Sequence, residues 1–146
     1  MIKYRGHIYR EAALRVQYHS APVERLDSIL EKGLLPPRNS SDVTTFQHSE
    51  IPTISTTDSP ENASVYNPSG VLFTLSVRPN TKWMRRSTRN TRKSERLVDS
   101  VRRWVQEAQD KGYDAIHVEG MQSTVGNQIL NPDVLEVTDY EIIGQH

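Results

Sequence analysis

The segment Val71–Val77 restricts the possible folds more than any other part of the chain. Its seven residues, VLFTLSV, are mostly β-branched, aliphatic or aromatic, and Gly70 precedes them while Pro79-Asn80 follows. An apolar run of this length between turn residues is typical of a strand that is buried on both faces. We therefore expect this segment to lie in the middle of a β-sheet.

Helical periodicity is clearest between Ser94 and Lys111, where apolar residues form one stripe and Gly112 follows the last turn. The stripe predicts that Trp104 belongs to the core. A second helix is expected over residues 22–32, with Ser20 as a cap and Gly33 as the stop signal. The motif Ser59-Pro60-Glu61 predicts the start of a third, short helix that runs to Tyr66.

Short β-type runs occur before, between and after these helices. Five further segments are expected to form strands, and they are 14–19, 51–56, 114–118, 127–131 and 134–143. Residues 36–50 are rich in Pro, Ser, Thr and Asn, so we expect a loop there that can cover a site. The pattern predicts an α+β fold of five to six strands and about three helices.

Length and composition predict one domain over residues 1–146, because one hydrophobic core suits a chain of this size. No segment has the ~20 consecutive apolar residues of a membrane span, and the first residues do not resemble a secretory signal. A cytoplasmic protein is the simplest expectation. The absence of cysteine excludes disulfides, a thiolate nucleophile and sulfur-bound zinc.

Charge is distributed unevenly along the chain, although its formal sum is zero. The segment Lys82 to Arg103 contains nine basic and two acidic residues, which leaves about +7 there and about −7 on the rest. Clustered Lys and Arg can bind phosphate groups or nucleic acid. A solvent-exposed helix face and loop would explain the same charges without any ligand.

The motifs of common enzyme classes are absent. The chain has no G-x-S-x-G, P-loop or G-x-G-x-x-G sequence, and its five histidines lack the spacing of metal ligands on one helix. A metal site is therefore not expected.

Three separated segments nevertheless form a recognisable series. The first is Tyr18-His19-Ser20, at the end of a predicted strand and before a helix. The second runs from Ile54 through Ser55-Thr56-Thr57 to Tyr66. The third leads from Gly112-Tyr113-Asp114 to Asn127-Gln128-Ile129-Leu130-Asn131-Pro132.

In order and spacing this series resembles the ADP-ribosyltransferase superfamily, whose fold bacterial mono-ADP-ribosylating toxins and poly(ADP-ribose) polymerases share. The resemblance spans residues 14–137 and mixes features of the histidine-bearing and arginine-bearing branches. It implies a split mixed β-sheet with an NAD cleft between the sheets. It also implies that NAD is the substrate, that nicotinamide leaves, and that ADP-ribose passes to a protein or nucleic-acid acceptor, with the basic segment Lys82 to Arg103 as a candidate contact.

The resemblance also assigns roles to individual residues. His19 would contact a ribose hydroxyl and Tyr66 would stack on the nicotinamide ring. Gln128 stands where the family carries its catalytic glutamate, and Ser20 stands where the histidine-bearing branch has glycine. The residues that would contact or support the nucleotide are Tyr18, His19, Ser20, Ser55, Thr56, Thr57 and Tyr66.

Gln128 is the main departure from the family pattern. Its amide keeps an acceptor oxygen but lacks the negative charge that stabilises an oxocarbenium-like transition state. Glu119 and Glu136 are near in sequence, but neither occupies the motif position. A relative that binds NAD, ADP-ribose or nucleic acid with weak or no catalysis is therefore the alternative.

Two further features bear on the acceptor. RNA 2′-phosphotransfer, which distant relatives of the fold carry out, would require arginines around the cleft, and Arg15, Arg38 and Arg78 are the candidates. The loop 121–125 precedes the catalytic strand and lacks an acidic residue. Gly126 stands where members that modify arginine carry an extra glutamate, so arginine is not the expected acceptor.

Overall fold

A computed structural model describes residues 14–34, 51–120 and 125–144. Within these ranges seven strands form two sheets, and helices pack on them. The fold is therefore α+β, as the sequence predicts. The predicted loop 36–50 lies outside the described residues.

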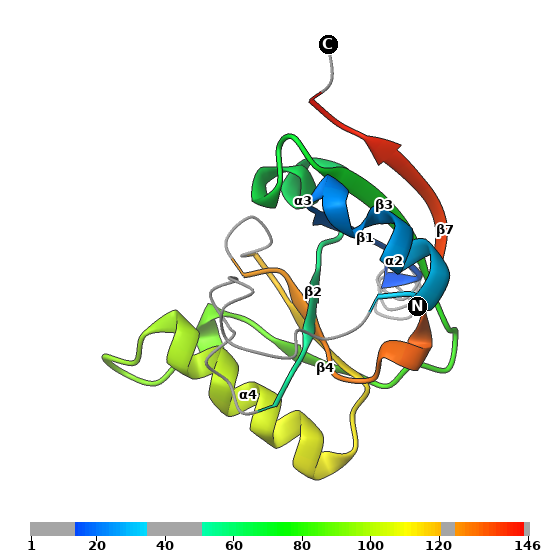
Figure 1. Cartoon of the computed structure of the whole chain (residues 1–146). Coiled ribbons are helices and arrows are strands. Elements are labelled where there is room, and N and C mark those ends of the chain that lie inside the picture. Colours follow the sequence, from blue (N-terminus) through cyan, green and yellow to red (C-terminus); the bar gives the residue numbers. More distant parts are fainter. Residues whose placement is uncertain (1–13, 35–50, 121–124, 145–146) are drawn as a thin grey trace, which may run out of the picture.

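The first sheet has three antiparallel strands in the order β1-β3-β7 (Figure 1). They are β1 (Val16–Ala21), β3 (Val71–Val77) and β7 (Leu135–Ile142). The central position of β3 confirms the expectation from its composition. Its apolar side chains are all buried, and β1 and β7 flank both of its edges.

The second sheet has four strands in the order β2-β6-β5-β4. They are β2 (Ile54–Thr56), β4 (Trp83–Arg86), β5 (Ala115–Val118) and β6 (Asn127–Ile129). Strands β4 and β5 are parallel, whereas the other neighbours are antiparallel. Strand β4 is not among the strands expected from the sequence, because its residues Trp-Met-Arg-Arg show no strand-like alternation and belong to the basic segment.

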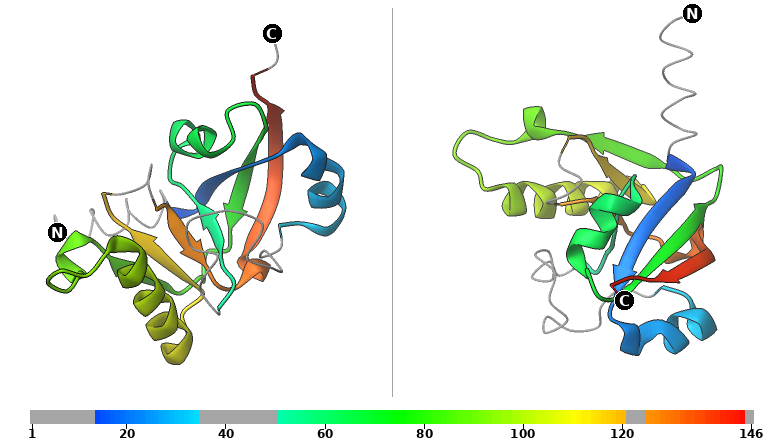
Figure 2. Two further views of the ribbon diagram at one scale, coloured as in Figure 1. Left: turned by 60° about the vertical axis from the view of Figure 1, so that its left-hand side comes forward. Right: turned by 90° about the horizontal axis from the view of Figure 1, so that it is seen from above.

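The two sheets touch where β1 meets the end of β2. Tyr18 and Thr57 exchange backbone hydrogen bonds of 2.9 Å in each direction. Among the described residues this is the one isolated backbone bridge between the sheets, and their strands diverge on either side of it (Figure 2).

Three α-helices complete the described fold, together with short 3₁₀ turns. Their bounds are α2 (Leu26–Lys32), α3 (Pro60–Tyr66) and α4 (Leu97–Lys111), with η1 (Val23–Arg25), η2 (Thr88–Asn90) and η3 (Pro132–Val134). Figure 2 shows α4 along the second sheet and α2 beside the first.

Helix ends follow local signals in most places. Ser59 caps α3 through its hydroxyl, which accepts a hydrogen bond from the amide of Asn62, and Gly112 ends α4 in the left-handed conformation, with φ of 76°. Helix α4 starts three residues later than expected, since Ser94 has φ of 64° and Arg96 is extended. The prediction that Ser20 caps a helix is wrong, because Ser20 is part of β1 and its hydroxyl bonds elsewhere.

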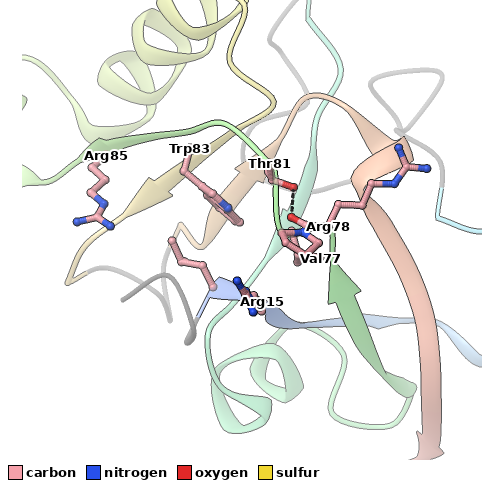
Figure 3. A pocket seen from close by; sticks show the side chains of 8 residues that line it. Arg15, Val77, Arg78, Thr81, Trp83 and Arg85 are labelled. Carbon is pink, nitrogen blue, oxygen red and sulfur yellow. Dashed lines mark hydrogen bonds between the residues drawn. The ribbon is translucent and has the colours of Figure 1, made fainter. Parts of the chain in front are cut away.

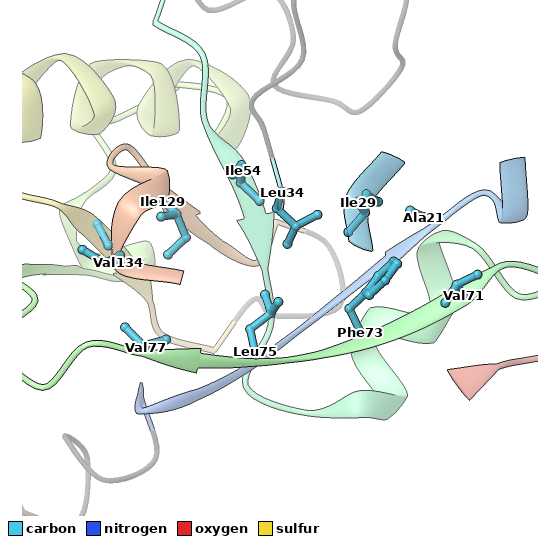
Figure 4. Packing of buried hydrophobic residues seen from close by; sticks show 11 residues of the cluster. Ala21, Ile29, Leu34, Ile54, Val71, Phe73, Leu75, Val77, Ile129 and Val134 are labelled. Carbon is cyan, nitrogen blue, oxygen red and sulfur yellow. The ribbon is translucent and has the colours of Figure 1, made fainter. Parts of the chain in front are cut away.

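Two apolar clusters hold these layers together. One lies between the sheets and α2, around Phe73, Leu75, Ile54 and Ile129 (Figure 4). The other lies between α4 and the second sheet, and Trp104 at its centre is fully buried, which confirms its predicted core position. The sheets are thus fixed relative to each other by burial of apolar surface.

No helix within the described ranges could span a membrane; the longest, α4, has 15 residues.

Candidate active site

Two polar side chains of strand β1, those of Gln17 and His19, face the second sheet. Alternation predicted a half-buried strand, yet the apolar Val16 is 41% exposed while Gln17 is fully buried. The strand itself is confirmed, but its burial does not follow the predicted alternation, because hydrogen bonds of polar residues hold Gln17 in the interior. Both Gln17 and His19 have partners on or beside β2. Of the functional candidates on β1, His19 therefore faces β2.

A small pocket lies between the end of β1, β2 and α3. We call it the His19 pocket, and its volume is about 30 Å³. It contains residues from the first two of the three segments on which the family resemblance rests. Its lining residues are Tyr18, His19, Ser20, Ser55, Thr57, Ala63, Tyr66 and Asn67.

The imidazole of His19 is held in one orientation. Its Nδ1 lies 2.6 Å from the carbonyl oxygen of Ser55. A carbonyl only accepts, so Nδ1 carries the hydrogen and Nε2 of the neutral ring is an acceptor. Burial lowers the pKa of His19; the charge of Arg25 acts in the same direction, while the bond to Ser55 opposes them. His19 is therefore a neutral acceptor near pH 7.

Helix α3 is attached to β1 next to this imidazole. The Ser20 hydroxyl donates to the backbone carbonyl of Ala63 at 2.5 Å, and the side-chain amide of Asn67 donates to the backbone carbonyl of Ser20 at 3.1 Å. These contacts bring Tyr66, the last residue of α3, to the pocket. The Tyr66 side chain is partly exposed, at 36%, and desolvation raises its pKa, so its phenol is neutral near pH 7.

Gln128 lies beneath the pocket, not on its wall. It sits on β6, between Ser55 of β2 and Ile116 of β5, and is fully buried. Its Oε1 accepts from Thr53 Oγ1 at 2.7 Å, and its Nε2 donates to Ser55 Oγ and to the Val125 carbonyl, both at 3.1 Å. Ser55 therefore connects Gln128 with the residues around His19.

The remaining predicted contacts divide between two faces of β2. Thr57 lines the His19 pocket, where its hydroxyl donates to the Ser59 carbonyl at 2.6 Å. Thr56 points to the opposite face, and its hydroxyl donates to Gln17 Oε1 at 2.7 Å. Thr56 therefore supports the β1–β2 junction but does not border the pocket.

Sequence reasoning missed a buried polar network on that opposite face. Gln17 Nε2 donates to Asp58 at 2.9 Å, and Asn127 Nδ2 donates to both Gln17 and Asp58, at 2.7 and 2.8 Å. Asn127 Oδ1 lies 2.9 Å from His117 Nδ1. Each residue alone looks like an ordinary strand residue; the signal appears only when β1, β2, β5 and β6 are assembled.

A second cavity, of about 140 Å³, lies where β1 begins and where the chain passes from β3 to β4. We call it the Arg15 cavity (Figure 3). Arg15, Arg78 and Arg85 border it, together with Trp83 and apolar residues. Arg15 and Arg78, which RNA 2′-phosphotransfer would require near His19, thus lie at this other cavity, and Arg38 lies outside the described residues.

The two alternative carboxylates are elsewhere. Glu136 is on β7 opposite Ser76 in the first sheet, and Glu119 follows β5, where its amide bonds to the Arg86 carbonyl. Neither lines the His19 pocket. In the described part of the chain, no three His, Asp or Glu side chains come together as metal ligands.

The chain matches no protein-family model and no curated protein.

Proposed function

We propose that this chain is an NAD-dependent mono-ADP-ribosyltransferase with an ADP-ribosyltransferase-like split sheet and an NAD site at the His19 pocket. One observation carries the proposal: His19, Ser55 and Tyr66 come from three different elements yet border one pocket, and Gln128 is hydrogen-bonded to Ser55. The resemblance in sequence requires these four residues to be neighbours. Two sheets that meet at one bridge agree with it.

The chemistry of the pocket is compatible with nicotinamide and its ribose. His19 Nε2 can accept a hydrogen bond from a ribose hydroxyl, because Nδ1 is committed to Ser55. The Tyr66 ring can lie against a cationic pyridinium. The volume of about 30 Å³ is far below the roughly 300–1,000 Å³ of typical ligand pockets, so binding of NAD requires the pocket to widen.

In the proposed reaction the bond between C1′ of the ribose and the nicotinamide nitrogen breaks. Its electron pair leaves with nicotinamide, which becomes neutral, and C1′ accepts an electron pair from an oxygen or nitrogen of the acceptor, whose proton passes to water. His19 and Tyr66 would orient the reacting ribose. Gln128 would act by hydrogen bonding alone, so we expect slow turnover.

The test is incubation of the protein with NAD labelled in its adenine, in the presence of a cell lysate. We expect transferred label and an equal amount of free nicotinamide. Tyr66→Ala should abolish both. Tyr140→Ala is the matched control, because Tyr140 is an exposed tyrosine of β7 in the first sheet. Bound NAD without any released nicotinamide would defeat the enzymatic proposal.

A second candidate function is NAD binding without turnover, and the environment of Gln128 favours it. The side chain is fully buried and both its amide oxygen and its nitrogen are already bonded within the protein. Calorimetry would then detect one NAD per chain with no nicotinamide release. Gln128→Glu separates the candidates, because a gain in nicotinamide release would support an active site at this position.

A further inference from the structure

The basic segment contains two kinds of cation. Several of its arginines form ion pairs with carboxylates of α4 and the residues next to it. These ion pairs are Arg86–Glu107, Arg96–Asp99, Arg102–Asp99 and Arg103–Glu95. Arg85 belongs to the segment's other cations, for which no ion pair with a described carboxylate is found; these are Lys82, Arg85, Arg89, Arg92 and Lys93. Among them, Arg85 borders the Arg15 cavity.

The charged side chains among the described lining residues of the Arg15 cavity are all arginines. Arg15, Arg78 and Arg85 border it, and none of its described lining residues is acidic. Figure 3 shows the Arg78 head turned away from Trp83, so Arg78 contributes mainly its stem. Arg15 and Arg85 are the other two guanidinium groups, and their heads lie apart from each other with Trp83 near both, so each would contact its own phosphate. Guanidinium groups bind phosphate oxygens through paired hydrogen bonds.

Trp83 adds an aromatic surface between these charges. Its ring is partly exposed at the cavity and contacts the ring of His117 edge-on, with centroids 6.4 Å apart and planes at 86°. The edge contact fixes one side of the indole. An aromatic ring beside arginines is the arrangement that holds unpaired bases while the cations contact the backbone.

The cavity is linked to the His19 pocket by β1. Arg15, Gln17 and His19 are alternate residues, and at about 3.3 Å per residue Arg15 lies ~13 Å along the chain from His19. Gln17 between them is fixed by hydrogen bonds to Thr56 and Asp58. The two sites are therefore held at a constant separation that a few nucleotides can span.

We propose that the Arg15 cavity binds single-stranded nucleic acid, with one phosphate on Arg15, another phosphate on Arg85 and a base on Trp83. That the bound strand is also the acceptor of ADP-ribose rests on the proposed function, whereas the binding itself does not. A duplex is disfavoured, because its paired bases are not free to stack on an indole.

The experiment measures binding of fluorescein-labelled 12-nucleotide oligo(dT) and oligo(U) by anisotropy, without NAD, from 50 mM to 1 M salt. The test variant is Arg15→Gln with Arg85→Gln. The control, Arg96→Gln with Lys111→Gln, removes the same charge from two exposed residues that pair with Asp99 and Glu107.

Each phosphate contact on a single strand contributes about 0.7 to the salt slope, so the test variant should lose about 1.4. When salt is lowered from 1 M to 0.1 M, the test variant should therefore gain roughly 25-fold less affinity than wild type. The control should keep the wild-type slope. Equal losses in both variants would overturn the site, because general charge would then explain binding.

Tryptophan fluorescence gives a second measurement that needs no folding-sensitive variant. The chain has two tryptophans, and Trp104 is fully buried, so quenching by an oligonucleotide reports on Trp83. We expect quenching by single strands. Absence of quenching, equal binding of a 12-base-pair duplex, or displacement by a glutamate 12-mer at matched charge would each refute the proposal.

Nicotinamide release from NAD is measured on the same proteins to separate the two proposals. Oligonucleotide binding that depends on Arg15 and Arg85, with no nicotinamide release, would support this site and reject the proposed enzyme. Nicotinamide release that persists in the double variant, without oligonucleotide binding to wild type, would support the enzyme and reject this site.

Discussion

Replacement of Gln128 by glutamate puts an oxygen in place of the side-chain NH2 group at a fully buried position. In wild type Nε2 donates to the Val125 carbonyl and to Ser55 Oγ, and Oε1 accepts from Thr53. The Ser55 hydroxyl can turn to donate to a carboxylate oxygen, and Thr53 still donates. Val125 cannot adapt, because its carbonyl would then face another acceptor at about the same place.

The size of the effect depends on pH. When the new carboxyl is protonated, it keeps an O–H donor for Val125, so the loss in unfolding free energy at low pH should be small. The ionised form leaves a buried carbonyl unpaired, at about 1–3 kcal/mol, and adds the cost of a buried charge. The folded variant can instead keep this carboxyl protonated, which costs about 1.36 kcal/mol for each pH unit above the unfolded pKa of ~4.3. This cost is the upper limit of the loss in stability that ionisation can cause.

Burial therefore raises the folded pKa of the new carboxyl above its unfolded value. The variant should lose stability relative to wild type as pH rises from about 4.3, and the loss should level off above the folded pKa. We expect a deficit of at most ~2 kcal/mol at pH 5.5 and about 3–5 kcal/mol at pH 8.

Urea denaturation of both proteins at pH 5.5, 7 and 8 measures this deficit. Gln109→Glu is the matched control, because Gln109 is exposed on α4 and a charge there should change stability by less than about 1 kcal/mol at all three pH values. A Gln128→Glu protein with the same deficit at pH 5.5 and 8 would show that the carboxylate reaches water, and the enclosure of Gln128 would be refuted.

Three further predictions test neighbouring contacts. Gly126→Ala should lower the unfolding free energy by about 1–3 kcal/mol more than Gly112→Ala does. Both glycines have positive φ, but only at Gly126 would a Cβ lie 2.6 Å from the Thr56 carbonyl oxygen. Equal urea midpoints of the two variants would contradict this. The lowered pKa of His19 implies stability that is present above the unfolded pKa of 6.5 and lost on acidification. His19→Asn should show a smaller loss between pH 8 and 5.5, and an unchanged loss would exclude His19 as its source. The pKa of Glu95 is lowered to about 2, mainly by the hydrogen bond that Arg103 donates to it. Stability should therefore fall as the pH drops from 4.5 to 2, and Glu95→Gln should remove this fall. An NMR titration midpoint of Glu95 near 4.5 would argue against that bond.

Local signals were sufficient for the elements whose apolar residues decide their structure. The stripe of α4, the run of β3 and the cap at Ser59 were predicted because burial or a hydroxyl group acts within a few residues of sequence. Ser20 failed as a cap for the opposite reason. Its hydroxyl bonds to Ala63, 43 positions away, and no local pattern encodes that partner.

Strand β4 and the burial of Gln17 could not be predicted for similar reasons. Strand β4 forms because parallel pairing with β5 satisfies its backbone, while Met84 alone supplies a fully buried apolar side chain from its four residues. Gln17 looks like the exposed side of an alternating strand, but Asp58, Thr56 and Asn127 satisfy its amide in the interior. Both depend on partners that only the assembled fold supplies.

The position of Gln17 explains how two pockets can be kept in register by so short a chain. A buried amide with unsatisfied groups would be costly, so its bonds hold β1 to residues on β2, on β6 and in the turn after β2 as one unit. His19 follows Gln17 by two residues and Arg15 precedes it by two. We therefore expect a change that loosens this amide to disturb the imidazole of one pocket and the guanidinium of the other more than a change in α4 does.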